Sequence, residues 1–347
     1  MPRNDDVLLR ADDLACWFDV SPPWLERTLS RQPMQTLKAV DGVSLAVPRG
    51  TTLSIVGESG CGKSTLAKLL VGLVAPTRGT LQYGRNRAGG VLYPQMIFQD
   101  PYASLNPRWR VGNIVAEPII TLGLRRTPAD TRRRVDELLE LVGLSASDAS
   151  RFPHEFSGGQ RQRISIARAL ATQAEFLVCD EPTSALDVSV QAQILNLMGD
   201  LQKEFGLTYV FISHNLSVVR HVSDSVAVMY LGRIVEQAPA DQLFESPRHP
   251  YTRMLLDTIP DLDEPRRDRE PMGGEVPNPI RPPSGCTFHP RCPEARDECR
   301  SEAPQVTQMG GTQTGGRQTG GTQTGGRQTG GRQLRCHAVR WERAVAA

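Results

Sequence analysis

Nine consecutive residues have the types and the spacing that bind phosphate groups. They match the pattern G-x-x-x-x-G-K-[ST] at every fixed position: Gly57, Glu58, Ser59, Gly60, Cys61, Gly62, Lys63, Ser64 and Thr65. Glycines let successive backbone N–H groups point at one anion, and a following helix presents its positive end to the same phosphates. Lys63 is expected to reach the β- and γ-phosphates and the Ser64 hydroxyl to bind Mg²⁺. The stretch predicts binding of a nucleoside triphosphate; a chance match in a glycine-rich turn is the alternative.

Two adjacent carboxylates follow a short apolar run, residues 176–179. In a phosphate-loop protein we expect Asp180 to hold the Mg²⁺ shell and Glu181 to polarise the attacking water. His214 closes another apolar run, residues 208–213, and its position in the same sheet favours contact with a γ-phosphate. A lone histidine is more often a hydrogen-bonded structural residue, and this alternative stays open.

A second candidate anion site lies at the start of a helical pattern that continues through residues 164–171. Its residues are Ser157, Gly158, Gly159 and Gln160. Small polar residues at a helix N-terminus suit an anion, because the free N–H groups and the helix dipole both favour negative charge. The alternative is an ordinary helix cap.

The elements that position these residues follow from apolar patterning. An apolar run, residues 52–56, leads into the phosphate loop, and a helical pattern, residues 66–71, leads out. Strand-like runs at 7–18 and 36–47 predict a small antiparallel sheet beside the nucleotide. Trp17 and Phe18 close the first run, where an aromatic ring either stacks on adenine or packs in the core. Helical patterns at 111–121 and 129–144 predict a helical insertion between two halves of an α/β core.

Composition limits the class of protein. The chain has 347 residues, 39% of them hydrophobic and 22% charged, which suits a folded nucleotide-binding domain with an extra module. A formal charge of +2 gives no argument for nucleic acid. No apolar run reaches the roughly 18 residues that span a bilayer, and no apolar signal core follows residues 1–6. We expect a cytosolic protein that other subunits hold at a membrane if it works there.

The ordered set of motifs resembles that of ATP-binding-cassette (ABC) ATPases over roughly residues 7–258. The set is the phosphate loop, Gln99, residues 157–160, residues 180–181, Asp187 and His214, and Phe156 replaces the usual leucine before the signature Ser-Gly-Gly-Gln. The resemblance implies an α/β P-loop NTPase core with an antiparallel β subdomain and a helical subdomain, plus a small cysteine-containing C-terminal extension. We expect the ATP-binding domain at 1–259, with the helical subdomain at about 100–172.

The resemblance also implies roles for single residues. Glu181 resembles the general base, helped by His214. Gln99 resembles the residue that contacts Mg²⁺ and water and senses the transmembrane partner. Phe18 resembles the aromatic residue that stacks on adenine, with Trp17 as second choice.

By the same resemblance, the signature residues act on a second subunit. Ser157, Gly158, Gly159 and Gln160 are expected to bind the γ-phosphate of ATP held by the opposite subunit, and Asp187 to cross the dimer interface. The implied mechanism is closure of a dimer around ATP, hydrolysis and reopening.

Within this superfamily the chain resembles ATP-binding subunits of oligopeptide and dipeptide importers. Three stretches carry the likeness: residues 98–107, 246–252 and 285–293. Such subunits lie at the cytoplasmic face of the membrane and pair with a homologous ATPase or with themselves. They drive two permeases, which receive solute from an extracytoplasmic solute-binding protein. Close relatives carry nickel and other solutes, so the substrate does not follow, and no nucleic acid is expected. A non-transport ABC ATPase of DNA repair or translation is the alternative; a GTPase or kinase fits least.

Four of the seven cysteines cluster near the C-terminus, as C-x5-C-x6-C-x36-C: Cys286, Cys292, Cys299 and Cys336. Four thiols in a reduced compartment suggest a metal site. Relatives carry similar cysteines that bind a [4Fe–4S] cluster in some members, so a cluster is the first hypothesis, zinc the second and free thiols the third. A Pro- and Arg-rich linker at 260–285 is expected to precede this module at 286–347, and a Gly/Gln/Thr repeat at 310–334 to form a flexible loop inside it.

Overall fold

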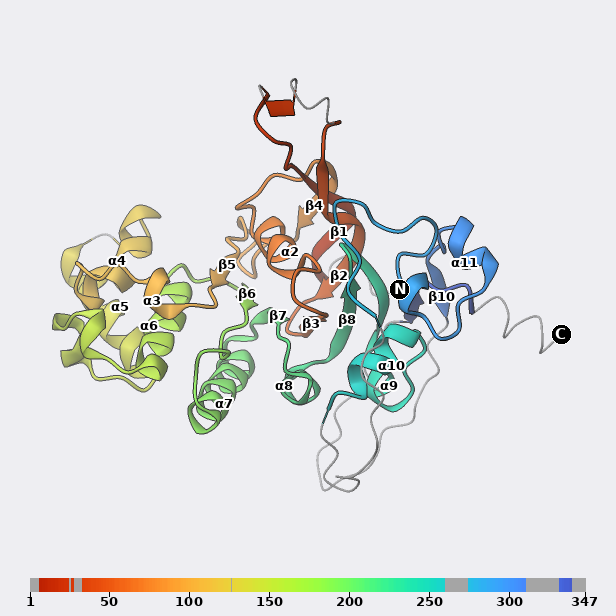
Figure 1. The fold of residues 1–347 in the computed structure, drawn as a ribbon. Coiled ribbons are helices and arrows are strands. Elements are labelled where there is room, and N and C mark those ends of the chain that lie inside the picture. The colour runs from red at the N-terminus through yellow and green to blue at the C-terminus, as the bar shows by residue number, and fades with distance from the viewer. Residues whose placement is uncertain are drawn as a thin grey trace, which may run out of the picture.

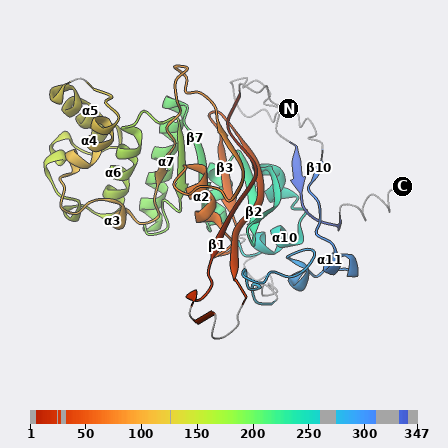
Figure 2. The same cartoon turned by 90° about the horizontal axis from the view of Figure 1, so that it is seen from above.

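The structure is a computed structural model that describes residues 6–24, 26–27, 33–125, 127–259, 274–309 and 331–338. Figure 1 shows a lobe of helices at one end, a sheeted centre that contains helix α2, and the C-terminal segment, residues 274–309 and 331–338, at the other end. The turned view in Figure 2 keeps the same order. The helical lobe and the C-terminal segment therefore lie on opposite sides of the sheeted centre.

The centre is an eight-stranded sheet in the order β10-β11-β9-β8-β3-β7-β6-β5. Its strands are β3 (Thr52–Val56), β5 (Gln95–Ile97), β6 (Phe176–Asp180), β7 (Thr208–Ile212), β8 (Ser225–Tyr230), β9 (Arg233–Pro239), β10 (Thr307–Met309) and β11 (Arg332–Leu334). The run from β8 through β3, β7 and β6 to β5 is parallel. Every residue of β3, β6 and β7 is buried, as expected for parallel strands covered on both faces.

A separate three-stranded antiparallel sheet has the order β2-β1-β4. It consists of β1 (Val7–Asp19), β2 (Thr36–Pro48) and β4 (Arg78–Tyr83). Side chains of β1 and β2 share one core with β3 and with α2 (Lys63–Leu70), which follows the phosphate loop. The predicted antiparallel subdomain is confirmed, and its contact with α2 fixes the sheet beside the loop.

The helical lobe lies between β5 and β6 in the chain. It contains α3 (Pro101–Ser104), α4 (Val111–Thr121), α5 (Pro128–Leu141), η2 (Ala146–Ser150), η3 (Pro153–Glu155) and α6 (Gly158–Leu170). Val115, Leu138 and Ile164 are fully buried in the core between its helices. The same core reaches β6 and β7, so the lobe packs on the sheet that carries the carboxylates.

The other helices flank the sheet and lead to the C-terminal segment. They are α7 (Val188–Phe205), α8 (Leu216–Val222), α9 (Ala240–Glu245), α10 (Pro250–Leu256), η4 (His289–Arg291) and α11 (Asp297–Ser301). Buried residues of β8, β9, α9 and α10 share a core with Phe288. The C-terminal segment therefore joins the hydrophobic core of the ATP-binding part.

The end of the predicted repeat loop differs from the expectation. Residues 310–330 lie outside the described part, but Arg332–Leu334 form strand β11, which pairs with both β10 and β9. Arg332 and Leu334 are buried there, and Arg332 makes an ion pair with Glu236 of β9. The repeat therefore ends in the central sheet. Of the predicted linker, residues 260–273 lie outside the described part, whereas Pro279 and Pro282 line a cavity with Lys38 of β2.

Candidate functional site

The chemistry-bearing residues lie at one edge of the central sheet. The phosphate loop follows β3, Gln99 follows β5, Glu181 follows β6 and His214 follows β7. These strands are parallel neighbours, so their carboxyl ends meet at the same edge, where open α/β sheets bind their ligands.

The phosphate loop needs glycine at two points of close approach. Gly57 has φ 153° and Gly62 has φ 107°, in the left-handed half of conformational space. A Cβ on Gly57 would lie 2.2 Å from the Met229 carbonyl oxygen, and one on Gly62 would lie 2.0 Å from the Ala39 carbonyl oxygen. The loop is therefore pressed against β8 and β2, and a side chain at either position would displace it.

Lys63 and Ser64 begin helix α2 at the end of the loop. The Lys63 ammonium donates to the carbonyl oxygens of Gly57 and Glu58, both at 2.8 Å, so its charge lies over the loop. The Ser64 hydroxyl donates to Asp180 Oδ1 at 3.2 Å. Burial raises the pKa of Asp180; the Ser64 hydrogen bond opposes this and the Glu181 charge adds to it. A hydroxyl and a carboxylate oxygen side by side are the hard ligands that Mg²⁺ prefers.

The three predicted catalytic residues meet at one carboxylate oxygen. Gln99 Nε2 donates to Glu181 Oε2 at 3.0 Å, and His214 Nδ1 lies 3.1 Å from the same atom. Glu181 itself has φ 47°, unusual for a residue with a side chain. This strained backbone lies between β6 and the next turn and aims the side chain at Gln99 and His214.

The residues of the phosphate loop differ in their exposure to solvent. Ser59, Gly60 and Ser64 are exposed, while Cys61 is buried and Thr65 is half-buried in α2. The Glu58 side chain is bound within the protein, because both its carboxylate oxygens accept hydrogen bonds from Arg291. Its N–H and carbonyl oxygen are also hydrogen-bonded, to Tyr251 Oη and Lys63 Nζ, so a direct contact of Glu58 with ATP stays a prediction.

Trp17 and Phe18 are both placed at the end of β1. Phe18 is 39% exposed, which leaves its ring available to a ligand. Trp17 is half-buried, with Lys38 Nζ 4.9 Å and the Arg78 guanidinium 5.8 Å from its ring centroids. Two cations already contact the Trp17 indole, whereas the Phe18 side chain is exposed.

The signature residues form the first turn of α6, away from α2 in both ribbon views. Ser157 Oγ accepts from the Gln160 N–H and Gln160 Oε1 accepts from the Ser157 N–H, a complete capping box. A Cβ on Gly159 would lie 2.4 Å from Val190 Cγ1, so α6 packs tightly on α7. Asp187, the residue before α7, is exposed.

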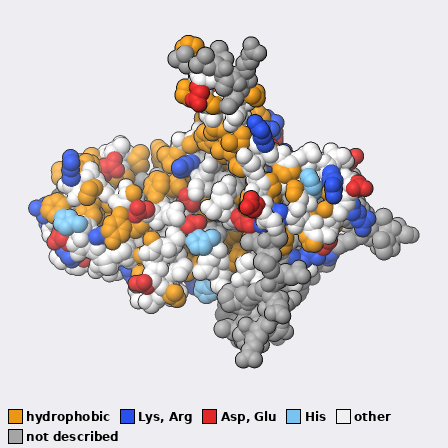
Figure 3. Space-filling model, in the orientation of Figure 1, with side chains coloured by type: hydrophobic (Ala, Val, Ile, Leu, Met, Phe, Trp, Pro, Cys, Tyr) orange, Lys and Arg blue, Asp and Glu red, His pale blue; other side chains and the backbone are white. Residues whose placement is uncertain are grey.

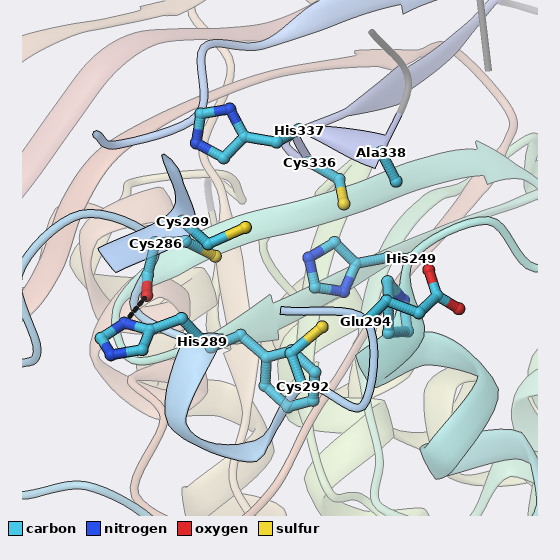
Figure 4. A pocket seen from close by; sticks show the side chains of 11 residues that line it. His249, Cys286, His289, Cys292, Glu294, Cys299, Cys336, His337 and Ala338 are labelled. Atoms are coloured by element: carbon cyan, nitrogen blue, oxygen red, sulfur yellow. Dashed lines mark hydrogen bonds between the residues drawn. The ribbon is translucent and has the colours of Figure 1, made fainter. Parts of the chain in front are cut away.

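The four C-terminal cysteines line a single cavity, which Figure 4 shows with their sulfur atoms directed inward. Burial raises the pKa of the Cys286 thiol, that of Cys292 to about 11 and that of Cys336 to about 12, so these groups are thiols at neutral pH. The cavity has a volume of about 10 Å³, room for one water molecule. Among the described residues no group of three or more Cys, His, Asp or Glu is arranged to hold a metal ion. The donor set suits a metal, but this arrangement does not support the cluster or the zinc hypothesis.

Sequence reasoning missed two residues that hold the phosphate loop, Arg291 and Tyr251. The Glu58 N–H donates to Tyr251 Oη at 2.9 Å, and Arg291 binds the Glu58 side chain. Both belong to stretches, 246–252 and 285–293, that mark the chain's subgroup. Those stretches were the available signal, but nothing in their residue types indicates a contact with residue 58.

Two family models match the chain. The ABC transporter model covers residues 40–184, and the model of the oligopeptide/dipeptide transporter C-terminal region covers residues 235–299. No helix in the described ranges is both long and apolar enough to cross a membrane.

Curated relatives match over most of their length. The di/tripeptide transport ATP-binding protein DppF of Pseudomonas aeruginosa is 48% identical, over 87% of this chain and 94% of the relative. The oligopeptide transport ATP-binding protein OppF of Salmonella typhimurium is also 48% identical, over 86% of this chain and 92% of the relative.

Solved structures share the fold. CbiO1 from Clostridium perfringens, part of the ABC transporter complex CbiONQ, matches with a TM-score of 0.56 and 25% identity, over 70% of this chain and 92% of its own. The ATP-binding cassette MJ0796, in a dimeric post-hydrolysis state bound to ADP and Pi, matches with a TM-score of 0.56 and 24% identity over 67% and 99%. With the relatives and the site geometry, these matches place the chain among the ATP-hydrolysing subunits of ABC transporters, in the family that carries the oligopeptide/dipeptide transporter C-terminal region.

Proposed function

We propose that this chain hydrolyses ATP to drive uptake of dipeptides or oligopeptides. The single observation that carries the chemistry is the meeting of Gln99, Glu181 and His214 beside the Ser64–Asp180 pair. The peptide substrate is proposed from the relatives, which are di/tripeptide and oligopeptide transport proteins by name.

The arrangement around Glu181 supports its role as general base. Gln99 and His214 both bind Oε2, which leaves Oε1 to accept a proton from water. The water oxygen then attacks the γ-phosphorus, the bond to the ADP oxygen breaks, and inorganic phosphate leaves with the water's oxygen. Lys63 supplies positive charge at the phosphates. Ser64 and Asp180 would hold Mg²⁺, which neutralises charge on the phosphate oxygens.

A second ATP-binding subunit completes the proposed site. Ser157 and Gln160 are exposed and lie in the helical lobe, away from the phosphate loop of the same chain. A signature motif that binds the γ-phosphate therefore acts on a partner's ATP. The capping box between the two side chains must open, or share its donors, when phosphate binds.

The helical lobe is the proposed contact with two membrane permeases at the cytoplasmic face of the membrane. Tyr102 and Trp109, 62% and 44% exposed, follow Gln99 closely in the chain. Figure 3 shows hydrophobic side chains on the surface of this lobe. A contact there would reach the catalytic carboxylate through Gln99, whose amide binds Glu181.

The experiment uses a stalled variant. Glu181→Gln keeps the size of the side chain and removes the base, so kcat should fall about 10²- to 10⁴-fold while ATP still binds. Tagged Glu181→Gln, extracted from membranes with ATP and Mg²⁺, should retain two multispanning permeases. Glu140→Gln, an exposed carboxylate of α5, is the matched control and should keep wild-type turnover. Rapid turnover by Glu181→Gln would refute the base, and DNA or ribosomes in place of permeases would favour the non-transport alternative.

A finer proposal for the cysteine cavity is a [4Fe–4S] cluster held by Cys286, Cys292, Cys299 and Cys336, which the present arrangement of the thiols does not accommodate. Its support is the convergence of four thiols on one cavity. The thiols would have to move apart and lose their protons, and a bound cation favours that loss. Anaerobically purified protein should contain iron and sulfide that Cys292→Ser loses. Colourless protein without iron would refute the cluster.

A further inference from the structure

The second residue of the phosphate loop is held by the C-terminal segment. Arg291 Nη1 and Nη2 donate to the two carboxylate oxygens of Glu58 at 2.7 and 2.9 Å. The Arg291 side chain is 3% exposed and that of Glu58 15%. A bidentate, largely buried ion pair of this kind fixes both the distance between the two side chains and their relative orientation. The Glu58 carboxylate raises the pKa of Arg291, so the cation persists at any working pH.

The backbone of Glu58 is fixed as well. Its N–H donates to Tyr251 Oη at 2.9 Å, and its carbonyl oxygen accepts from Lys63 at 2.8 Å. Tyr251 is fully buried in α10. Glu58 is therefore held by its side chain, its N–H and its carbonyl group. Lys63, which contacts phosphate in the proposed mechanism, depends directly on where that carbonyl lies.

A cluster of aromatic rings joins these supports. The ring centroids of Tyr230 and Tyr251 are 4.7 Å apart, and Phe288 lies 5.3 Å and 5.4 Å from them. The Arg291 guanidinium lies 5.9 Å from the Tyr230 ring. Tyr230 ends β8, whose Met229 carbonyl packs on Gly57 of the loop. The rear wall of the phosphate loop thus consists of residues from β8, α10 and the C-terminal segment.

We propose that Arg291 and Tyr251 are positioning residues for ATP binding, acting through Glu58. Both contact the phosphate loop at Glu58, and through it they set the backbone path of the loop and the place of the Lys63 ammonium. The C-terminal segment is by this argument part of the nucleotide site. The inference rests on the proposed ATP hydrolysis and adds two residues, 193 and 233 positions from Glu58, to the groups that govern it.

The test separates KM from kcat. Arg291→Met removes the charge but keeps the length of the side chain, and it leaves the Glu58 carboxylate stranded behind the loop. We expect KM for ATP to rise about tenfold or more, with kcat at saturating ATP changed less than about threefold, because the contacts of Glu181 are untouched. Arg253→Met is the matched control: it breaks an exposed pair with Glu294 at 2.6 Å between α10 and the same segment, and KM should stay at the wild-type value.

A second background shows whether Arg291 acts through Glu58. In Glu58→Gln no carboxylate is stranded, so the further effect of Arg291→Met on KM should fall below about threefold. An unchanged KM in Arg291→Met, or an equal effect in both backgrounds, would overturn the proposal.

Tyr251→Phe keeps the ring and removes only the acceptor of the Glu58 N–H. It tests the proposal if Arg291→Met does not fold, and it too should raise KM; an unchanged KM would count against the role of Tyr251. Absence of ATPase activity in the wild-type protein would instead refute the proposed function itself.

Discussion

Replacement of Arg332 by methionine should loosen the strand that ties the C-terminal segment to the sheet. Arg332 Nε lies 3.5 Å from Glu236 Oε1, and its Nη2 donates to the Gln242 carbonyl oxygen at 2.7 Å. The Glu236 side chain is fully buried, and that of Arg332 is 10% exposed. The variant Arg332→Met therefore leaves a buried carboxylate without this cation.

The size of the effect follows from what Glu236 keeps. Its two oxygens still accept from the N–H groups of Arg248 and His249, at 3.0 and 2.9 Å. Loss of one partner from a buried pair costs about 3–5 kcal/mol, and the remaining donors favour the lower value, about 3 kcal/mol. Because 1.36 kcal/mol is a factor of ten, the opening equilibrium of β11 should shift by roughly 10²-fold.

Hydrogen exchange measured by mass spectrometry on a peptide that contains residues 331–338 reads this opening directly. Amides of β11 should exchange roughly 10²-fold faster in Arg332→Met than in wild type. Gln333→Ala, a neighbour on the same strand whose side chain is half-buried, is the control and should change exchange only a few-fold. Adding Glu236→Gln to Arg332→Met removes the stranded charge and should restore much of the protection. Exchange within threefold of wild type in Arg332→Met, or no recovery in the double variant, would refute the reasoning.

Two further predictions concern packing and pH. Gly159→Ala should lower the free energy of unfolding by about 1–2 kcal/mol, because overpacking against Val190 outweighs the better helix propensity of alanine; thermal unfolding with and without Val190→Ala measures it. Burial lowers the pKa of His249 to about 3, so the unfolded chain binds a proton below pH 6.5 that the folded chain excludes. Stability should fall as pH drops from about 6.5 towards 3, by on the order of 5 kcal/mol in total, and melting temperatures across that range measure it.

Each of these has a matched control. Val190→Ala should suppress the loss caused by Gly159→Ala, and an equal loss in both backgrounds would contradict the clash. His249→Asn retains an oxygen that can accept the Tyr251 N–H but does not titrate. If its stability falls in acid as steeply as that of wild type, the buried histidine is not the cause.

The local sequence determined the elements of the nucleotide site and their order. A phosphate loop between an apolar strand and a helix, carboxylates after a buried strand and a histidine after the next each follow from local patterning. Parallel strands bring their carboxyl ends to one edge, so the meeting of Gln99, Glu181 and His214 could be anticipated from the resemblance. Helix α4 has the bounds that the pattern predicts, because its apolar spacing is regular over several turns.

Only the tertiary structure decided how the C-terminal segment connects to this site. The pair of Arg291 with Glu58 spans 233 positions, and the pairing of β11 with β9 includes the end of a polar repeat that local pattern assigns to a loop. Such contacts depend on which surfaces face one another after folding, and short segments carry little information about distant partners. Arg332 illustrates the reason: in isolation it is one more arginine of a Gly-rich repeat, and only the buried carboxylate of Glu236 makes it structural.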